Sequence, residues 1–156
     1  MPDSTPALTP LLQEFVDARI GPAELLRRAQ ALLPPGSDAS GEILTWLAES
    51  DQMLRLPPDR KALAQRLGEF AREKISWEEL DLWAFAVEHT EALSPDHVSG
   101  IPEVELLREL LDWIEEWQEA DARPGGERLD HMATILLAET DPARCLARLE
   151  QVLERA

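Results

Sequence analysis

The chain has 156 residues, of which 44% are apolar and 29% are charged, a composition typical of one compact globular domain. Its 31 acidic and 15 basic residues give a formal net charge of −16, which argues against partners such as nucleic acid or an anionic membrane. The same charge would attract a basic protein partner, although it also keeps a protein soluble when no partner is present.

Apolar residues recur at helical spacing along the chain, and no alternating run of Val, Ile or Thr is long enough for a strand. Ser76 and Glu79 have the spacing of a capping box. Proline at the first helical position is expected after Thr9, Gly21, Pro57, Ile101 and Asp141. The expected helices lie at 10–19, 22–33, 40–53, 58–73, 77–91, 102–121, 127–139 and 142–155. The sequence therefore predicts an all-α protein, a single compact bundle of about eight helices over residues 1–156.

Two pairs of segments resemble each other. "LQEFVDARIGPAEL" aligns with "LGEFAREKISWEEL", which places Phe15 on Phe70, and "EILTWLAE" aligns with "ELLDWIEE". We interpret this as a duplicated three-helix unit at 10–53 and 58–121, followed by a helical pair at 127–155. Chance similarity between short helical segments rich in Glu and Leu is the alternative. Duplication predicts that Phe15 and Phe70 are buried at equivalent hairpin corners.

The sequence contains no recognisable catalytic or metal-binding motif. None of the histidines, His89, His97 and His131, belongs to a His-Glu-x-x-His or Glu-x-x-His pair, and no loop has phosphate-binding spacing. Cys145 lies near an expected helix start beside Arg144, where the helix dipole would lower its pKa, but a lone helical cysteine is more often a core residue. We expect no metal, no cofactor and no enzymatic activity; an enzyme that uses scattered carboxylates is the alternative.

The expected location is the cytoplasm. A single cysteine excludes an intrachain disulfide and fits a reducing compartment. The segment "MPDSTPALTP" lacks the basic flank and apolar run of a signal peptide, and no apolar run is long enough to span a bilayer.

The expected helix at 102–121 carries one acidic face. At about 100° per residue, its leucines and Ile114 gather on the side that should face the core. The carboxylates on the opposite side, here called the acidic stripe, are Glu105, Glu109, Asp112, Glu116 and Glu119. Trp113 lies at the border between the two faces, and Trp117 lies slightly closer to the core; the other three tryptophans are expected in the core.

An acidic face beside a tryptophan is typical of an interface for a basic protein, because aromatic anchors contribute binding energy and charge accelerates association. The acidic stripe, Trp113 and Trp117 are therefore the candidate partner-binding residues. A solvated outer face that binds nothing is the alternative.

The first hairpin also resembles a known family. "LLQEFVDARIGPAELLRRAQALL" is similar to the opening of colicin-D-type immunity proteins, and "EFAREKISWEELDLWA" is similar to the corresponding stretch in immunity proteins of bacterial polymorphic toxin systems. Where such proteins often have Gly in the turn, this chain has Ala18 and Glu73. The resemblance implies a helical, acidic, cytoplasmic inhibitor that covers the active surface of a basic nuclease toxin. A helical adaptor or scaffold that binds a partner helix in a groove is the alternative.

Overall fold

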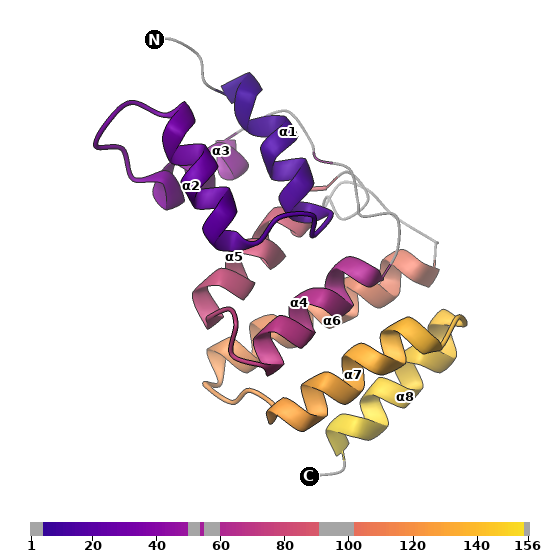
Figure 1. The fold of residues 1–156 in the computed structure, drawn as a ribbon. Coiled ribbons are helices and arrows are strands. Elements are labelled where there is room, and N and C mark those ends of the chain that lie inside the picture. Colours follow the sequence, from indigo (N-terminus) through magenta and orange to yellow (C-terminus); the bar gives the residue numbers. More distant parts are fainter. Residues whose placement is uncertain (1–4, 50–53, 55–59, 91–101, 155–156) are drawn as a thin grey trace.

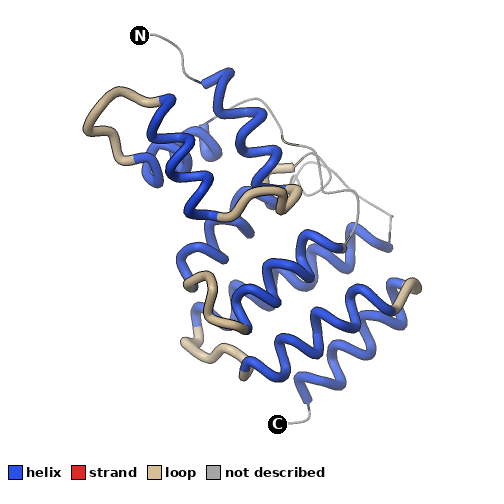
Figure 2. The backbone as a smooth tube through the Cα atoms, viewed as in Figure 1, coloured by secondary structure: helices blue, strands red, loops and turns tan. Residues whose placement is uncertain are grey.

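The computed structural model describes residues 5–49, 54, 60–90 and 102–154. Within these ranges the fold is all-α, as predicted, and Figures 1 and 2 show helices joined by short connections. The eight helices are α1 (Thr5–Val16), α2 (Pro22–Leu32), α3 (Ala39–Glu49), α4 (Lys61–Ala71), α5 (Trp77–Glu88), α6 (Pro102–Glu119), α7 (Gly126–Ala138) and α8 (Pro142–Glu154). The only β-type pairing among the described residues is an isolated bridge between Leu54 and Thr90.

Several helices begin at the predicted signals. Pro22 opens α2 after the N-cap Gly21. At α5 the capping box is complete, because the Ser76 hydroxyl accepts a hydrogen bond from the Glu79 backbone at 3.1 Å and the Glu79 carboxylate accepts one from the Ser76 backbone at 2.9 Å. Asp141 caps α8 by accepting a hydrogen bond from the Arg144 backbone at 2.9 Å.

The predicted start of the first helix is wrong. Helix α1 begins at Thr5, so Pro10 lies inside the helix rather than at its first position. Upstream extension places Leu8 in the core, where it is 3% exposed, while Pro10 faces solvent on the other side. The free energy gained by burying Leu8 thus offsets the loss of the backbone hydrogen bond that Pro10 cannot donate. The predicted start at Pro57-Pro58 lies outside the described residues, and α4 is described from Lys61.

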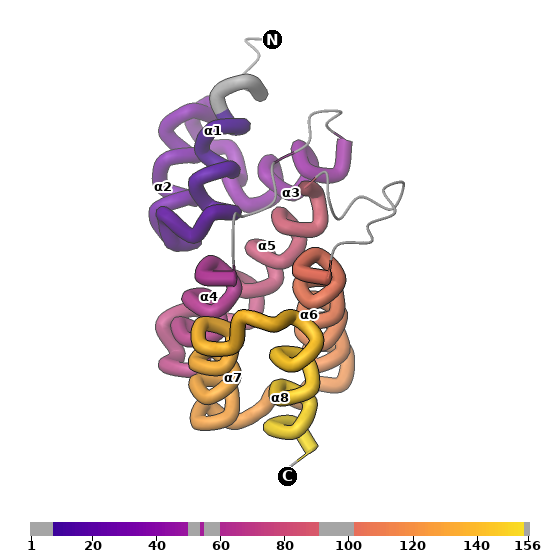
Figure 3. Tube along the Cα trace, turned by 90° about the vertical axis from the view of Figure 1, so that its right-hand side faces the viewer, coloured from indigo at the N-terminus to yellow at the C-terminus, as the bar shows by residue number. Residues whose placement is uncertain are grey.

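Helix α5 joins the two ends of the molecule. Figures 1 and 3 place α1, α2 and α3 at one end, α4, α6, α7 and α8 at the other, and α5 between them. It contacts α1, α2, α4 and α6. At the far end α4 packs most extensively against α7, and a Cβ on Gly126 would lie only 2.9 Å from the Ala71 carbonyl oxygen. This close approach requires glycine at the start of α7.

The two matched hairpin corners have the same backbone. Ala18 and Glu73 adopt left-handed conformations, with φ of 60° and 58°. In each corner the left-handed residue donates to a phenylalanine carbonyl, Phe15 at 3.0 Å and Phe70 at 3.1 Å. The next residue in each donates to the carbonyl one position before that phenylalanine, at 2.9 and 2.8 Å, which completes a Schellman motif. Both phenylalanines are fully buried, so their predicted equivalence is confirmed.

The corner geometry does not by itself favour duplication over chance. Helix α6 ends in the same motif, with Asp121 at φ 50° donating to Gln118 at 3.2 Å and Ala122 donating to Trp117 at 2.9 Å. That corner belongs to neither matched segment. A recurring helix-end geometry therefore accounts for the shared backbone, and the duplicated three-helix unit stays a hypothesis.

Candidate functional site

Helix α6 has an apolar buried side and an acidic exposed side, as the periodicity predicts. Leu107, Leu110, Leu111 and Ile114 are buried. In the acidic stripe Glu105, Asp112, Glu116 and Glu119 are exposed, and Glu109 is half-buried. The carboxylates therefore form an outward face, available to a partner.

The two tryptophans beside the stripe differ in accessibility. Trp113 is only 9% exposed, and its indole nitrogen donates to a Glu109 carboxylate oxygen at 3.1 Å. Trp117 is half-buried and packs on the core. The predicted order is therefore wrong: Trp113 lies closer to the core, and Trp117 keeps more surface for a partner. Of the other tryptophans, Trp46 and Trp83 are buried as expected, and Trp77 is half-buried against Phe70 with the ring centroids 4.7 Å apart.

A hollow of about 400 Å³ lies between α5 and α6, and we call it the acidic recess. Its apolar floor is formed by Ala84, Phe85, Leu111 and Ile114, and its polar rim by Asp81, Glu88, Glu115, Gln118 and Glu119. The floor residues are buried or half-buried, whereas the rim residues are exposed. Glu119 belongs to both the recess and the acidic stripe, so the two features form one face.

Charge is unfavourable inside the recess. The pKa of Glu88 is raised to about 7, first because its carboxyl is partly removed from water and then because Glu115, Asp81 and Asp112 repel its charge. Burial also raises the pKa of Asp81, and a hydrogen bond with Gln118 partly offsets that rise. No described Lys or Arg forms an ion pair with Glu88. Near neutral pH this carboxyl is partly protonated, and a cation placed beside it would restore its charge.

The recess was not predicted from the sequence. Asp81, Phe85 and Glu88 have i, i+4, i+7 spacing, which places them on one helical face and was a usable signal. The packing of α5 beside α6 was the missing information, because it brings Glu115 and Leu111 to the same hollow.

In the described part of the chain the histidines belong to no group of metal-ligating side chains. His89 contacts the Phe85 carbonyl oxygen through Nδ1 at 2.7 Å, and its ring packs against the Phe85 ring at a tilt of 55° with centroids 4.5 Å apart. His131 is exposed on α7, and His97 lies outside the described residues. Within the same ranges no three His, Cys, Asp or Glu side chains are grouped as metal ligands, and no helix has the length and apolar character of a membrane span.

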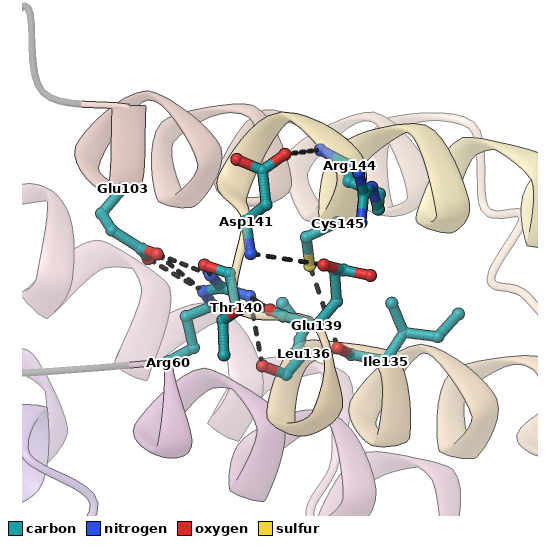
Figure 4. Close-up of polar contacts among 9 residues, drawn as sticks. All are labelled: Arg60, Glu103, Ile135, Leu136, Glu139, Thr140, Asp141, Arg144 and Cys145. Atoms are coloured by element: carbon teal, nitrogen blue, oxygen red, sulfur yellow. Dashed lines mark hydrogen bonds and ion pairs between the residues drawn. The ribbon is translucent and has the colours of Figure 1, made fainter.

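A second polar cluster surrounds Arg60 and is structural (Figure 4). Arg60 is 8% exposed, and its guanidinium donates to both carboxylate oxygens of Glu103 at the start of α6, at 2.6 and 2.9 Å. It also donates to the carbonyl oxygens of Leu136 at 3.4 Å, Thr140 at 2.8 Å and Glu139. These are unpaired carbonyls at the end of α7, so Arg60 caps that helix and ties it to α4 and α6. All three guanidinium nitrogens are engaged, which leaves none for a ligand.

Cys145 lies beside this cluster and is a core residue. It is fully buried, and its sulfur lies 4.0 Å from the Ile135 carbonyl oxygen. The favoured prediction of a core cysteine is confirmed, and the alternative of a lowered pKa at the helix start is wrong, because burial raises the pKa of the thiol more than Arg60 lowers it.

No protein-family model, curated protein or solved structure matches this chain. The resemblance to colicin-D-type immunity proteins therefore stays a prediction. The α5–α6 face, which combines the acidic stripe and the acidic recess, is the strongest candidate site.

Proposed function

We propose that this protein is a non-catalytic binding protein that takes a basic polypeptide on its α5–α6 face. The observation that carries the proposal is the acidic recess, where carboxylates from two helices surround an apolar floor and Glu88 has no described cation beside it. A basic partner would supply the missing positive charge. The net charge of −16 would accelerate the encounter.

The more specific form of the proposal is an immunity protein, which binds a basic bacterial nuclease toxin in the cytoplasm and covers its active surface. Its supports are the acidic face and the resemblance of the first hairpin to colicin-D-type immunity proteins. Occlusion requires no catalytic group on this chain. The inhibitor would act by steric block and by charge complementarity.

A helical adaptor is the second candidate, and a different surface favours it. A groove of about 350 Å³ between α1 and α2 is lined by Pro10, Leu11, Glu14, Arg27, Arg28, Ala31 and Leu32. Leu32 is 42% exposed at this groove, so an apolar partner helix would bury it.

Capture from the native host with three baits tests the proposal. The baits are the wild type, the reversal Asp112→Lys/Glu116→Lys on α6, and the matched reversal Glu150→Lys/Glu154→Lys on α8. Each pair consists of exposed residues four positions apart, so the change in net charge is identical. We expect a stoichiometric basic protein with the wild type and the α8 bait and its loss with the α6 bait.

An acidic partner, or one that all three baits retain equally, would contradict the proposal. If the captured protein is a toxin, co-expression of the wild type should restore growth of cells that produce it. Restoration should fail with the α6 reversal. If the substitution Leu32→Ser, and not the α6 reversal, abolishes capture of the partner, the adaptor is favoured.

A further inference from the structure

The acidic recess has the dimensions and chemistry for one long basic side chain. Its volume of about 400 Å³ falls near the lower end of the about 300–1,000 Å³ usual for ligand pockets, which is too small for a helix. The floor offers Phe85, Leu111 and Ile114 to methylene groups, and the rim offers carboxylates to a charged end. Lysine and arginine combine these two properties in one side chain.

The rim also favours a planar cation over a point charge. Asp81 and Glu88 project from α5, while Glu115 projects from α6, so a bound cation would be shared by two helices. A guanidinium presents five N–H donors in a fixed plane and can bind carboxylates on opposite sides at once. An ammonium would satisfy fewer of these acceptors.

We propose that the acidic recess receives one arginine side chain of the basic partner, with its methylenes on Phe85 and Ile114 and its guanidinium between Glu88 and Glu115. This inference rests on the proposed function, because it specifies how the α5–α6 face holds its partner. The acidic stripe outside the recess then acts mainly on the rate of encounter.

The electrostatics of Glu88 support this assignment. Its pKa is raised by burial and by repulsion from Glu115, Asp81 and Asp112, and a guanidinium bound beside it would oppose that rise by favouring the charged carboxylate. Binding should therefore release the proton that Glu88 holds near neutral pH. A cation beside Glu105 or Glu116 would have less effect on Glu88, because these exposed stripe residues do not line the recess.

The test uses a labelled octa-arginine peptide and two matched neutralised variants of the full chain. Glu88→Gln/Glu115→Gln alters the recess, and Glu105→Gln/Glu116→Gln removes the same charge from the acidic stripe. We expect the recess variant to weaken binding by about tenfold, or about 1.4 kcal/mol, and the stripe variant by about two- to threefold. Circular dichroism melts confirm that both variants are folded. In the wild type, carboxyl carbon NMR should show the Glu88 titration midpoint falling when the peptide binds.

Equal weakening by the two variants would overturn the recess as a site while leaving the acidic face as the binding surface. No effect of either variant would overturn both the recess and the proposed function. An octa-lysine peptide that binds as tightly as octa-arginine, with the same dependence on Glu88 and Glu115, would overturn the preference for a guanidinium.

Discussion

At the scale of single residues, the most informative group is Glu88. Its carboxyl is surrounded by other carboxylates and partly removed from water, so its charge is disfavoured in the folded chain. A residue placed only for stability would carry no charge here. We interpret the unfavourable charge as one that the partner's cation relieves.

Glu88 should make stability depend on pH. Its pKa rises from an ordinary value of 4.5 to about 7, so the folded state holds this proton more tightly than the unfolded state. The contribution to folding is fully present below pH 4.5 and is lost as pH rises through about 7. Glu88→Gln stays neutral and should be more stable than the wild type at about pH 8 by about 0.5–1 kcal/mol, a small value because water screens this exposed side chain.

Urea denaturation at about pH 5 and about pH 8 measures the effect. The advantage of Glu88→Gln over the wild type should be larger at the higher pH. A constant difference between the two proteins at both pH values would contradict the raised pKa.

The hairpin phenylalanines give a second prediction at the same scale. Phe15 and Phe70 are fully buried. The guanidinium carbon of Arg66 lies 5.2 Å from the centroid of the Phe15 ring, and that of Arg123 lies 4.5 Å from the centroid of the Phe70 ring. Replacing either phenylalanine by Ala should lower the free energy of unfolding by about 3–5 kcal/mol, measured by urea denaturation. A loss below about 1 kcal/mol at one corner would show that its core refills and that the corners are not equivalent in energy.

At the scale of helices, buried side chains of α4 and α5 donate hydrogen bonds to the C-terminal end of α1. Arg66 of α4 is fully buried and donates to the carbonyl oxygens of Phe15, at 3.3 Å, and Ile20, while it pairs with Glu69 at 2.7 Å. Trp83 of α5 donates to Phe15 and Val16 at 3.1 and 3.3 Å. Side chains of α4 and α5 thus add hydrogen bonds to the end of α1, beyond those of its own Schellman motif.

Replacement of Arg66 by Met keeps most of the volume but removes these donors. The Ile20 carbonyl oxygen and the Glu69 carboxylate would lose the hydrogen bonds that Arg66 donates, so we expect the free energy of unfolding to fall by about 2–4 kcal/mol in urea denaturation. The control is Arg27→Met, because Arg27 is 69% exposed and pairs only with Glu24 on its own helix. Equal effects of the two substitutions would show that the buried contacts of Arg66 do not stabilise α1.

The helices also show what local sequence signals can predict. The capping box at Ser76 and the prolines that open α2, α6 and α8 act within one helical turn, and the structure confirms those starts. The start of α1 depends on the burial of Leu8, which requires the rest of the core. The exposed side of the acidic stripe followed from periodicity, whereas the acidic recess needed the packing of two helices. Cys145 shows the same limit, since its pKa depends mainly on burial in the assembled core.

At the scale of the whole molecule, a net charge of −16 accompanies a concave acidic face between α5 and α6. Long-range charge would bring a basic partner toward the protein, and the recess between α5 and α6 would hold it. The buried Arg60, which precedes α4, and Arg66 within α4 donate to the ends of other helices, and neither lines the acidic recess. The polar groups that connect the helices are thus separate from the proposed binding face.

The most direct test measures the association rate of the captured basic partner by stopped flow at increasing salt. For Asp112→Lys/Glu116→Lys we predict association at least about tenfold slower than wild type at low salt and a weaker dependence on salt, because these charges act on encounter. The matched reversal Glu150→Lys/Glu154→Lys should change the rate by less than about threefold. If the α6 reversal binds with the wild-type rate and salt dependence, the α5–α6 face is solvated surface and the partner binds elsewhere.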